Sequence, residues 1–134
     1  MAIVWTPSYA IGIPEIDHQH QELFYRLSKL LEGLVGGDRA EVRRLIDFLG
    51  EYVVVHFGAE ERWMKESEYP DFEEHKSQHE RFMQDYLRYS VELDQRGSTA
   101  LMGMRVNNWI ADWLRNHILV SDMALGRFLS QKLG

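Results

Sequence analysis

The middle of this chain reads His56-Phe57-Gly58-Ala59-Glu60, then Tyr69-Pro70, then His75-Lys76-Ser77-Gln78-His79. The first and last of these segments each carry a pair of candidate metal ligands at i, i+4 spacing. Residues spaced in this way lie on one face of a helix, about one turn apart. Pro70 separates two helices, so the two pairs can face each other across a bundle. The stretch therefore predicts four ligands that converge on one place.

Length and composition predict a folded protein with one domain over residues 1–134. A chain of 134 residues is long enough for one hydrophobic core. It is 45% hydrophobic and 12% aromatic, which excludes a disordered chain. The net charge is −6 and the basic residues are scattered. Phosphate binding needs a clustered basic face, so we expect no nucleic-acid partner.

The sequence contains no cysteine, which excludes disulfides, thiolate-held metal clusters and cysteine nucleophiles within this chain. Any metal ion must therefore be held by histidine and carboxylate side chains. No apolar run approaches the roughly 20 residues that cross a bilayer. The start, Met1-Ala2-Ile3-Val4-Trp5, lacks the charged and apolar regions of a signal peptide. We therefore expect a cytoplasmic protein without a membrane segment.

Apolar periodicity predicts four amphipathic helices with short connections. The first starts between Pro14 and Asp17 and ends at Gly36-Gly37, the second opens on Asp38, the third opens on Asp71, and the fourth follows the loop at 96–99. Asp38 and Asp71 are each followed three residues later by Glu, as in a capping box. The fold class is therefore all-α, an antiparallel up-down-up-down four-helix bundle. Residues 1–14 are expected to form an extended arm, and residues 123–133 a short helical tail.

Polar side chains interrupt the apolar stripes that face the core: His20, His56, Glu60, His75, His79 and His117. A buried polar group is costly unless it is satisfied, and a lone histidine of this kind is usually an ordinary core residue. In an antiparallel bundle, positions early in the first and third helices lie level with positions late in the second and fourth. All six side chains therefore meet in one layer, and together they predict a metal site.

The number of ligands predicts two metal ions. Five imidazoles and Glu60 exceed the four ligands of a tetrahedral zinc site. Asp122 is a further candidate, although it follows His117 by five residues, a less favourable spacing on an α-helix. Seven ligands suit two ions bridged by two carboxylates, and this nitrogen-rich set fits iron. Because five histidines cannot be shared equally, one ion should keep a position for a small exogenous ligand.

This pattern resembles the hemerythrin family, and bacterial hemerythrins in particular. The resemblance is carried by His20, His56-x3-Glu60, His75-x3-His79 and His117-x4-Asp122. The flanking words Ile16-Asp17-His18-Gln19-His20, His56-Phe57, Tyr69-Pro70 and Trp113-Leu114-Arg115-Asn116-His117-Ile118 also match. It covers the chain from Trp5 to about Asp122.

The resemblance implies a non-haem di-iron centre that binds dioxygen reversibly. It assigns one iron to His75, His79 and His117, and the other to His20 and His56. Glu60, Asp122 and an oxo or hydroxo group would bridge the two ions, and dioxygen would bind end-on to the iron held by two histidines. By their positions beside the ligands, the residues expected to line the oxygen pocket are Phe57, Trp113, Leu114 and Ile118. His18 has no place in the pattern and should face solvent.

Three functions are compatible with this site. The first is carriage, storage or delivery of dioxygen, without enzymatic activity. The second is an oxygen or redox sensing module of a signalling or chemotaxis system, although no output surface can be identified. The third is a di-iron enzyme that handles peroxide, nitric oxide or ferrous iron. Ferritin-like oxidases use two Glu-x-x-His motifs, whereas Glu15-Ile16-Asp17-His18 has no second copy here. No protein partner is indicated.

Overall fold

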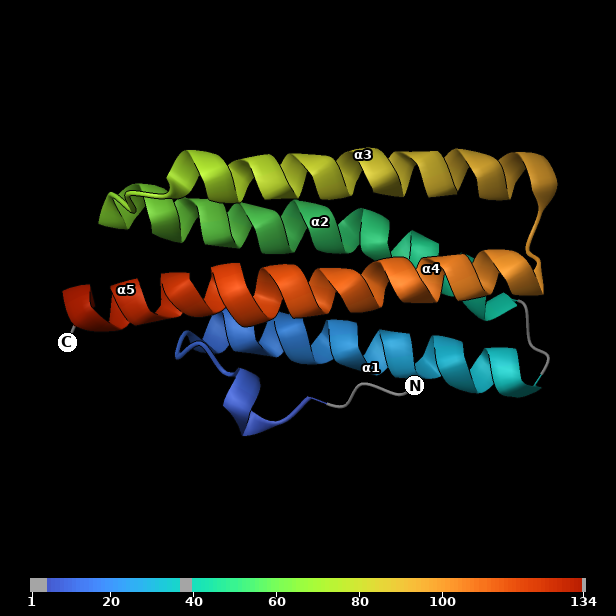
Figure 1. The fold of residues 1–134 in the computed structure, drawn as a ribbon, viewed down its shortest axis with the longest axis horizontal. Helices are drawn as coiled ribbons and strands as arrows, with labels where there is room; N and C mark the ends of the chain where they lie inside the picture. The colour runs from blue at the N-terminus through green and yellow to red at the C-terminus, as the bar shows by residue number, and fades with distance from the viewer. Residues whose placement is uncertain (1–4, 37–39, 134) are drawn as a thin grey trace.

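The computed structural model describes residues 5–36 and 40–133. Its helices are α1 (Pro14–Gly36), α2 (Ala40–Ser67), α3 (Phe72–Arg96), α4 (Ala100–Trp113) and α5 (Met123–Leu133). A π-helical segment, η2 (Leu114–Asp122), joins α4 to α5, so that the three form one continuous rod along the bundle (Figure 1). The chain start up to Val4 and the predicted capping residue Asp38 lie outside the described residues.

The helices form the antiparallel four-helix bundle that the periodicity predicts. α1 packs beside α2, α2 beside α3, and α4 returns beside α1 (Figure 1). The short connections make neighbouring helices antiparallel, as in up-down-up-down bundles. The predicted helical tail is confirmed as α5. In the part of the chain that the structure describes, no helix has the length and apolar character needed to cross a membrane.

The helix ends are set by local signals, with one departure from the prediction. Gly97 takes a positive φ of 76° at the end of α3, and its N–H donates to the carbonyl of Leu93 at 2.8 Å. Thr99 caps α4, because its hydroxyl accepts from Met102 N–H at 3.1 Å. The predicted capping box at Asp71 is wrong. The Asp71 side chain makes no capping hydrogen bond, because the Asp71 backbone lacks the extended conformation that this cap needs.

The arm is less extended than predicted. A 3₁₀ turn, η1 (Pro7–Tyr9), interrupts it, and Trp5 packs against the core. The arm then turns into α1, where the Asp17 carboxylate accepts from the backbone N–H of Ile11 at 2.7 Å. Ile11 lies against α5, where Gly126 leaves room for its backbone. The arm is therefore held at both ends of its contact with the bundle.

The buried apolar residues fall into two clusters, and the predicted ligand layer separates them. On α1, Ile16 belongs to the smaller cluster and Leu23 to the larger one, with His20 between them. On the rod formed by α4, η2 and α5, Ile118 belongs to the larger cluster and Leu125 to the smaller one, with Asp122 between them. The polar layer is therefore enclosed by apolar packing on both sides along the bundle axis.

We predict that Gly126→Ala destabilises the protein by about 1–3 kcal/mol through overpacking. An added methyl group would lie 2.5 Å from the carbonyl oxygen of Ile11, too close for van der Waals contact. The matched control is Gly58→Ala on α2, where an added methyl group meets no atom within 4 Å. This control should stabilise the protein by about 0.5–1 kcal/mol because alanine favours a helix. Urea unfolding of both variants measures the difference, and equal effects would contradict the close approach of the arm.

Candidate metal centre

The π-helical segment η2 places Asp122 on the same face as His117. Backbone hydrogen bonds of a π-helix join residues five apart, and such segments are frequent at functional sites. Residues i and i+5 therefore lie one above the other, unlike in an α-helix. As a result, Asp122 Oδ1 lies 3.0 Å from His117 Nε2. The spacing that looked unfavourable from the sequence is thus accommodated by a local change of helix type.

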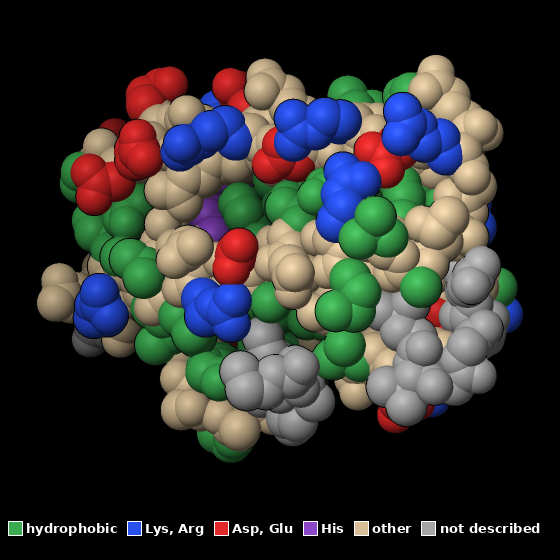
Figure 2. All heavy atoms as spheres, turned by 45° about the vertical axis from the view of Figure 1, so that its right-hand side comes forward, with side chains coloured by type: hydrophobic (Ala, Val, Ile, Leu, Met, Phe, Trp, Pro, Cys, Tyr) green, Lys and Arg blue, Asp and Glu red, His purple; other side chains and the backbone are tan. Residues whose placement is uncertain are grey.

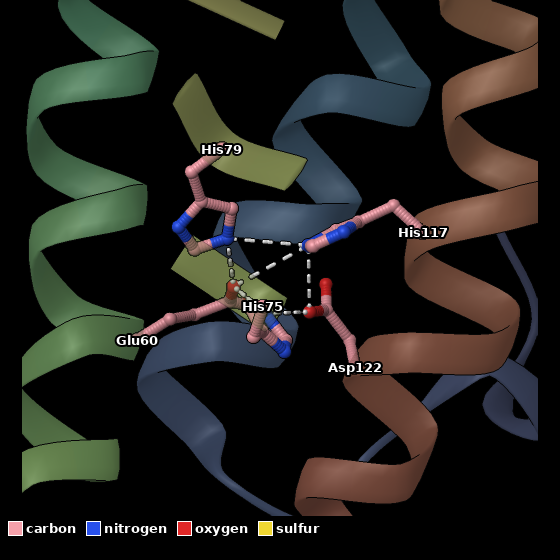
Figure 3. Close-up of side chains that lie close together, drawn as sticks. All are labelled: Glu60, His75, His79, His117 and Asp122. Atoms are coloured by element: carbon pink, nitrogen blue, oxygen red, sulfur yellow. Dashed lines mark hydrogen bonds and ion pairs between the residues drawn. The ribbon is translucent and has the colours of Figure 1, made fainter. Parts of the chain in front are cut away.

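All seven predicted ligands converge in the interior, and each is between 0% and 2% exposed. They are His20 from α1, His56 and Glu60 from α2, His75 and His79 from α3, and His117 and Asp122 from η2. Figure 3 shows five of them, with their side chains directed at one another from three elements. Because α1, α2, α3 and η2 all contribute, the layer forms only when the whole bundle is assembled.

The two carboxylates lie between two groups of histidines. Oε1 of Glu60 is 3.0 Å from His75 Nε2 and 2.9 Å from His79 Nε2, whereas its Oε2 is 3.2 Å from His56 Nε2. Asp122 is arranged in the same way, with Oδ1 3.0 Å from His75 Nε2 and Oδ2 3.0 Å from His20 Nε2. Each carboxylate therefore offers one oxygen to each group, which is the arrangement of a bridging ligand.

Ligand atoms gather into two overlapping sets, each within 4.8 Å. The first contains Glu60, His75, His79, His117 and Asp122, and the second contains His20, His56, Glu60 and Asp122. Bonds from histidine nitrogen or carboxylate oxygen to a metal such as zinc measure about 2.0–2.2 Å, so small movements would let one ion bind each set. The two sets share both carboxylates, but the first set has three histidines and the second has two.

The electrostatics of the layer call for positive charge. Burial lowers the pKa of His20, but interactions with Asp122 and Glu60 outweigh this effect and raise it to about 9. The same balance raises the pKa of His75 to about 10. Burial favours the neutral form of Glu60, yet the neighbouring histidines hold its pKa well below the usual range. The metal-free layer therefore keeps its carboxylates ionised and balances them with protonated imidazoles.

The donor atoms fit metal ions better than they fit one another. Among the described residues, neither oxygen of Asp122 has a hydrogen bond of good geometry, although imidazole nitrogens lie 3.0 Å away. His20 Nε2 and His56 Nε2 are 3.2 Å apart, as are His79 Nε2 and His117 Nε2. Two lone pairs at this distance repel unless a proton or a cation lies between them. Imidazole and carboxylate together form a donor set suited to iron.

Comparison with known proteins supports this interpretation. The family model described as Hemerythrin HHE cation binding domain matches residues 11–129. The chain belongs to the hemerythrin family. The predicted resemblance is therefore confirmed, and the match includes every residue of the two ligand sets.

Relatives in the hemerythrin family are similar over most of their length. A bacteriohemerythrin of Methylococcus capsulatus is 30% identical over 131 residues, which cover 96% of this chain and 97% of the relative. A bacteriohemerythrin of Stenotrophomonas maltophilia is 34% identical over 122 residues, covering 91% of this chain and 78% of that protein. The crystal structure of a hemerythrin point mutant matches with a TM-score of 0.83 at 28% identity, over 97% of this chain and 99% of that one. The family fold therefore accounts for nearly the whole chain.

Three ligands are oriented by hydrogen bonds that the sequence analysis missed. Nδ1 of His56 lies 2.7 Å from Gln19 Oε1, Nδ1 of His117 lies 2.6 Å from Gln78 Oε1, and Nδ1 of His79 lies 3.1 Å from Glu61 Oε2. An Nδ1–H that donates outward leaves the Nε2 lone pair free to face the centre. Each partner is adjacent in sequence to a ligand, but polar residues are so common on helix flanks that this position alone is no signal.

Aromatic rings stack on three of the candidate ligands, and one of these rings is Tyr52, whose centroid is 4.7 Å from that of His56. Phe57 stacks on His79 with ring centroids 3.9 Å apart, and Trp113 stacks on His117 at the same distance. Leu114 and Ile118 are buried in the larger apolar cluster. All four residues predicted to line an oxygen pocket therefore lie beside the ligand layer or in the core that adjoins it. His18 is exposed, as predicted.

We predict that the metal-free protein takes up two Fe²⁺ or Co²⁺ ions per chain, one for each ligand set. A ligand that binds only the folded state stabilises it by about 4.1 kcal/mol at a thousandfold excess over Kd, so the melting temperature should rise. His79 belongs to one set, so His79→Ala should remove one ion and keep the other. Glu60 belongs to both sets, and Glu60→Gln should weaken both.

The matched control for this titration is His18→Ala, which removes an exposed histidine from the same protein. It should keep the full metal content and the full rise in melting temperature, measured by elemental analysis and calorimetry. Equal metal content in His79→Ala and His18→Ala would contradict the assignment of ligands.

Proposed function

We propose that this hemerythrin-family protein binds dioxygen reversibly at a carboxylate-bridged di-iron centre and serves in oxygen carriage, storage or delivery. The proposal rests on the placement of Glu60 and Asp122. Each carboxylate turns one oxygen toward the group of three histidines and the other oxygen toward the group of two. In the proposal, His75, His79 and His117 hold one iron, and His20 and His56 hold the other. When bound, such a pair supplies two electrons to dioxygen and takes them back on release.

The unequal histidine sets determine where a small ligand enters. Both carboxylates serve both ions, so the ion held by His20 and His56 has one protein ligand fewer. The chain therefore leaves a coordination position on that side, inside the buried layer. Dioxygen is small and apolar enough to reach such a position, whereas larger substrates are excluded by the packed bundle.

The surrounding side chains restrict water and protons. Phe57 lies flat on His79 and its ring centroid is 5.9 Å from that of His56, and Trp113 lies flat on His117. Leu114 and Ile118 are no more than 1% exposed. An apolar shell controls solvent access to a metal site and the reactivity of what binds there. We propose that these four residues line the oxygen pocket and slow irreversible oxidation. The Nδ1 partners Gln19, Gln78 and Glu61 hold the ligands in place while dioxygen comes and goes.

The proposal includes a cytoplasmic location, a single domain over residues 1–134, and binding without chemical conversion of dioxygen. Reversible carriage needs no acid or base beside the ligands, and in the proposal Glu61, a further carboxylate at the layer, serves only to orient His79. Fractionation of cells that produce the protein tests the location, and limited proteolysis tests the domain assignment.

We predict that the reduced, iron-loaded protein develops near-ultraviolet and visible charge-transfer bands on exposure to dioxygen. These bands should vanish when dioxygen is removed and return over repeated cycles, because binding consumes no substrate. Absorption spectroscopy with a parallel iron count measures both, and zinc-loaded protein serves as the colourless control. Bands that persist after deoxygenation, as an inert diferric form, would contradict reversible binding.

Loss of the ring over His79 should shorten the life of the oxygenated form. Phe57→Leu keeps an apolar side chain but removes the stacked ring, so water reaches the centre more easily and autoxidation becomes faster. Phe48→Leu is the matched control, since Phe48 stacks on Tyr52 rather than on a ligand. Decay of the oxygenated spectrum measures the effect, and equal rates in the two variants would argue against a protective role of Phe57.

A further inference from the structure

A continuous series of aromatic rings leads from the ligand layer along the interface between α3 and α4. It begins where Trp113 stacks on His117, with ring centroids 3.9 Å apart and planes 12° apart. The contacts then run from Trp113 to Phe82 at 4.6 Å, from Phe82 to Trp109 at 4.7 Å, and from Trp109 to Tyr89 at 4.8 Å. We call Trp113, Phe82, Trp109 and Tyr89 the aromatic column.

We propose that the aromatic column is an electron-transfer route between the metal centre and the protein surface, through which one-electron donors repair the oxidation caused by hydrogen peroxide. The inference rests on the proposed di-iron function and goes beyond it, because oxygen carriage alone requires no route for electrons to the surface.

The chemistry of the side chains supports this route. Tryptophan and tyrosine are among the side chains that lose an electron most easily, and a tryptophan can do so while keeping its proton for a time. Electron tunnelling falls steeply with distance, so rings in contact transfer electrons far faster than separated ones. Phenylalanine is not oxidised under these conditions, but Phe82 touches both tryptophans and bridges them.

The electrons and atoms of the complete process balance. Hydrogen peroxide takes two electrons and two protons and becomes two water molecules, with cleavage of its O–O bond. For each electron that is needed, Tyr89 is oxidised at the outer end of the column and releases its phenolic proton to water. The electron then passes along the column to the metal centre. A hydrogen-atom donor of the ascorbate or phenol class then restores Tyr89. The sum is one peroxide and two donor molecules giving two waters and two donor radicals.

The two tryptophans of the column are accessible to such a donor from a cleft, and Tyr89 lies outside this cleft. Trp109 and Trp113 line a cleft of about 370 Å³ that also reaches His117. Arg81, Asp85 and Asp112 contribute charged groups to the same cleft. On the face drawn in Figure 2, a histidine is visible at the base of a hollow with basic and acidic side chains around it. A small polar donor can therefore approach the column without entering the bundle.

The outer end of the column is held in place by an ion pair. The Arg105 guanidinium lies over the Tyr89 ring, 5.5 Å from its centroid. Arg105 in turn donates to both carboxylate oxygens of Glu92, at 2.6 and 3.2 Å. Tyr89 is partly exposed, so its proton can leave to solvent.

In the described part of the chain, the stacked rings on the other side of the centre form a shorter series that ends on a phenylalanine. Tyr52 stacks on His56 at 4.7 Å, and Phe48 stacks on Tyr52 in turn. Phenylalanine is not oxidised under these conditions, so the series does not continue to a second oxidisable ring. The Tyr52 hydroxyl is buried and has no hydrogen-bond partner in the described part of the chain. Its proton therefore has no acceptor, which disfavours oxidation of this tyrosine. Oxidising equivalents should leave through Trp113 instead.

The test maps oxidised side chains by peptide mass spectrometry after hydrogen peroxide is added to the iron-loaded full chain without a donor. An iron count and an absorption spectrum are recorded first. We expect oxidation at Trp109 and Tyr89 to exceed that at Tyr25 several-fold, although Tyr25 is 55% exposed and open to solvent. An excess of ascorbate should suppress the modification. Zinc-loaded protein gives the background from radicals in solution.

Two variants separate the route from simple accessibility. Trp109→Phe keeps a ring in the core but interrupts the route, so oxidation of Tyr89 should fall to the level of Tyr25. Tyr25→Phe is the matched control and should leave Tyr89 oxidation unchanged. If Trp109→Phe lowers the iron content, Tyr89→Phe replaces it, and oxidation should then accumulate at Trp109.

Three results would overturn the inference: Tyr89 oxidised no more than Tyr25, equal oxidation in zinc-loaded protein, or unchanged Tyr89 oxidation in Trp109→Phe. These are distinct from failure of the proposed function, which would appear earlier as a chain that binds no iron or shows no reversible oxygen spectrum.

Discussion

The structure depends on two buried carboxylates. Glu60 and Asp122 are fully buried and stay ionised, and isolated charges in an apolar interior are very costly. Five histidines surround them, and two metal ions held by both carboxylates would neutralise the layer more completely than protons can. The bundle is therefore built around a requirement for positive charge at its centre, with apolar clusters on both sides.

Geometry then converts this requirement into a site with two unequal halves. The bundle brings three histidines to one side of the carboxylates and two to the other. The π-helical turn before α5 brings Asp122 level with the histidines. Hydrogen bonds donated by imidazole Nδ1–H groups to Gln19, Gln78 and Glu61 fix the imidazole orientations, and stacked rings limit the approach of water. The aromatic column starts on one of these ligands, so the same packing that protects the centre also offers a path to the surface.

The helices and the convergence of the seven candidate ligands were predictable because burial and periodicity constrain them together. His20 and His79 lie on apolar stripes, and the antiparallel order of the helices brings them to one level. The π-helical turn was not predictable, since a shift in backbone hydrogen bonding leaves no trace in hydrophobic periodicity. Gln78 was missed because a polar residue on a helix flank is ordinary in sequence and acquires its role only through His117. The cap at Asp71 failed because the backbone conformation there depends on the turn at Tyr69-Pro70.

In the proposed centre, two metal ions share Glu60 and Asp122 but differ in the histidines that hold them. Mössbauer spectroscopy of the reduced, iron-loaded protein tests this arrangement most directly, because it distinguishes iron sites by their ligand environment. We expect two ferrous signals of equal area from two inequivalent sites in each chain. One signal from a single iron per chain would contradict this arrangement.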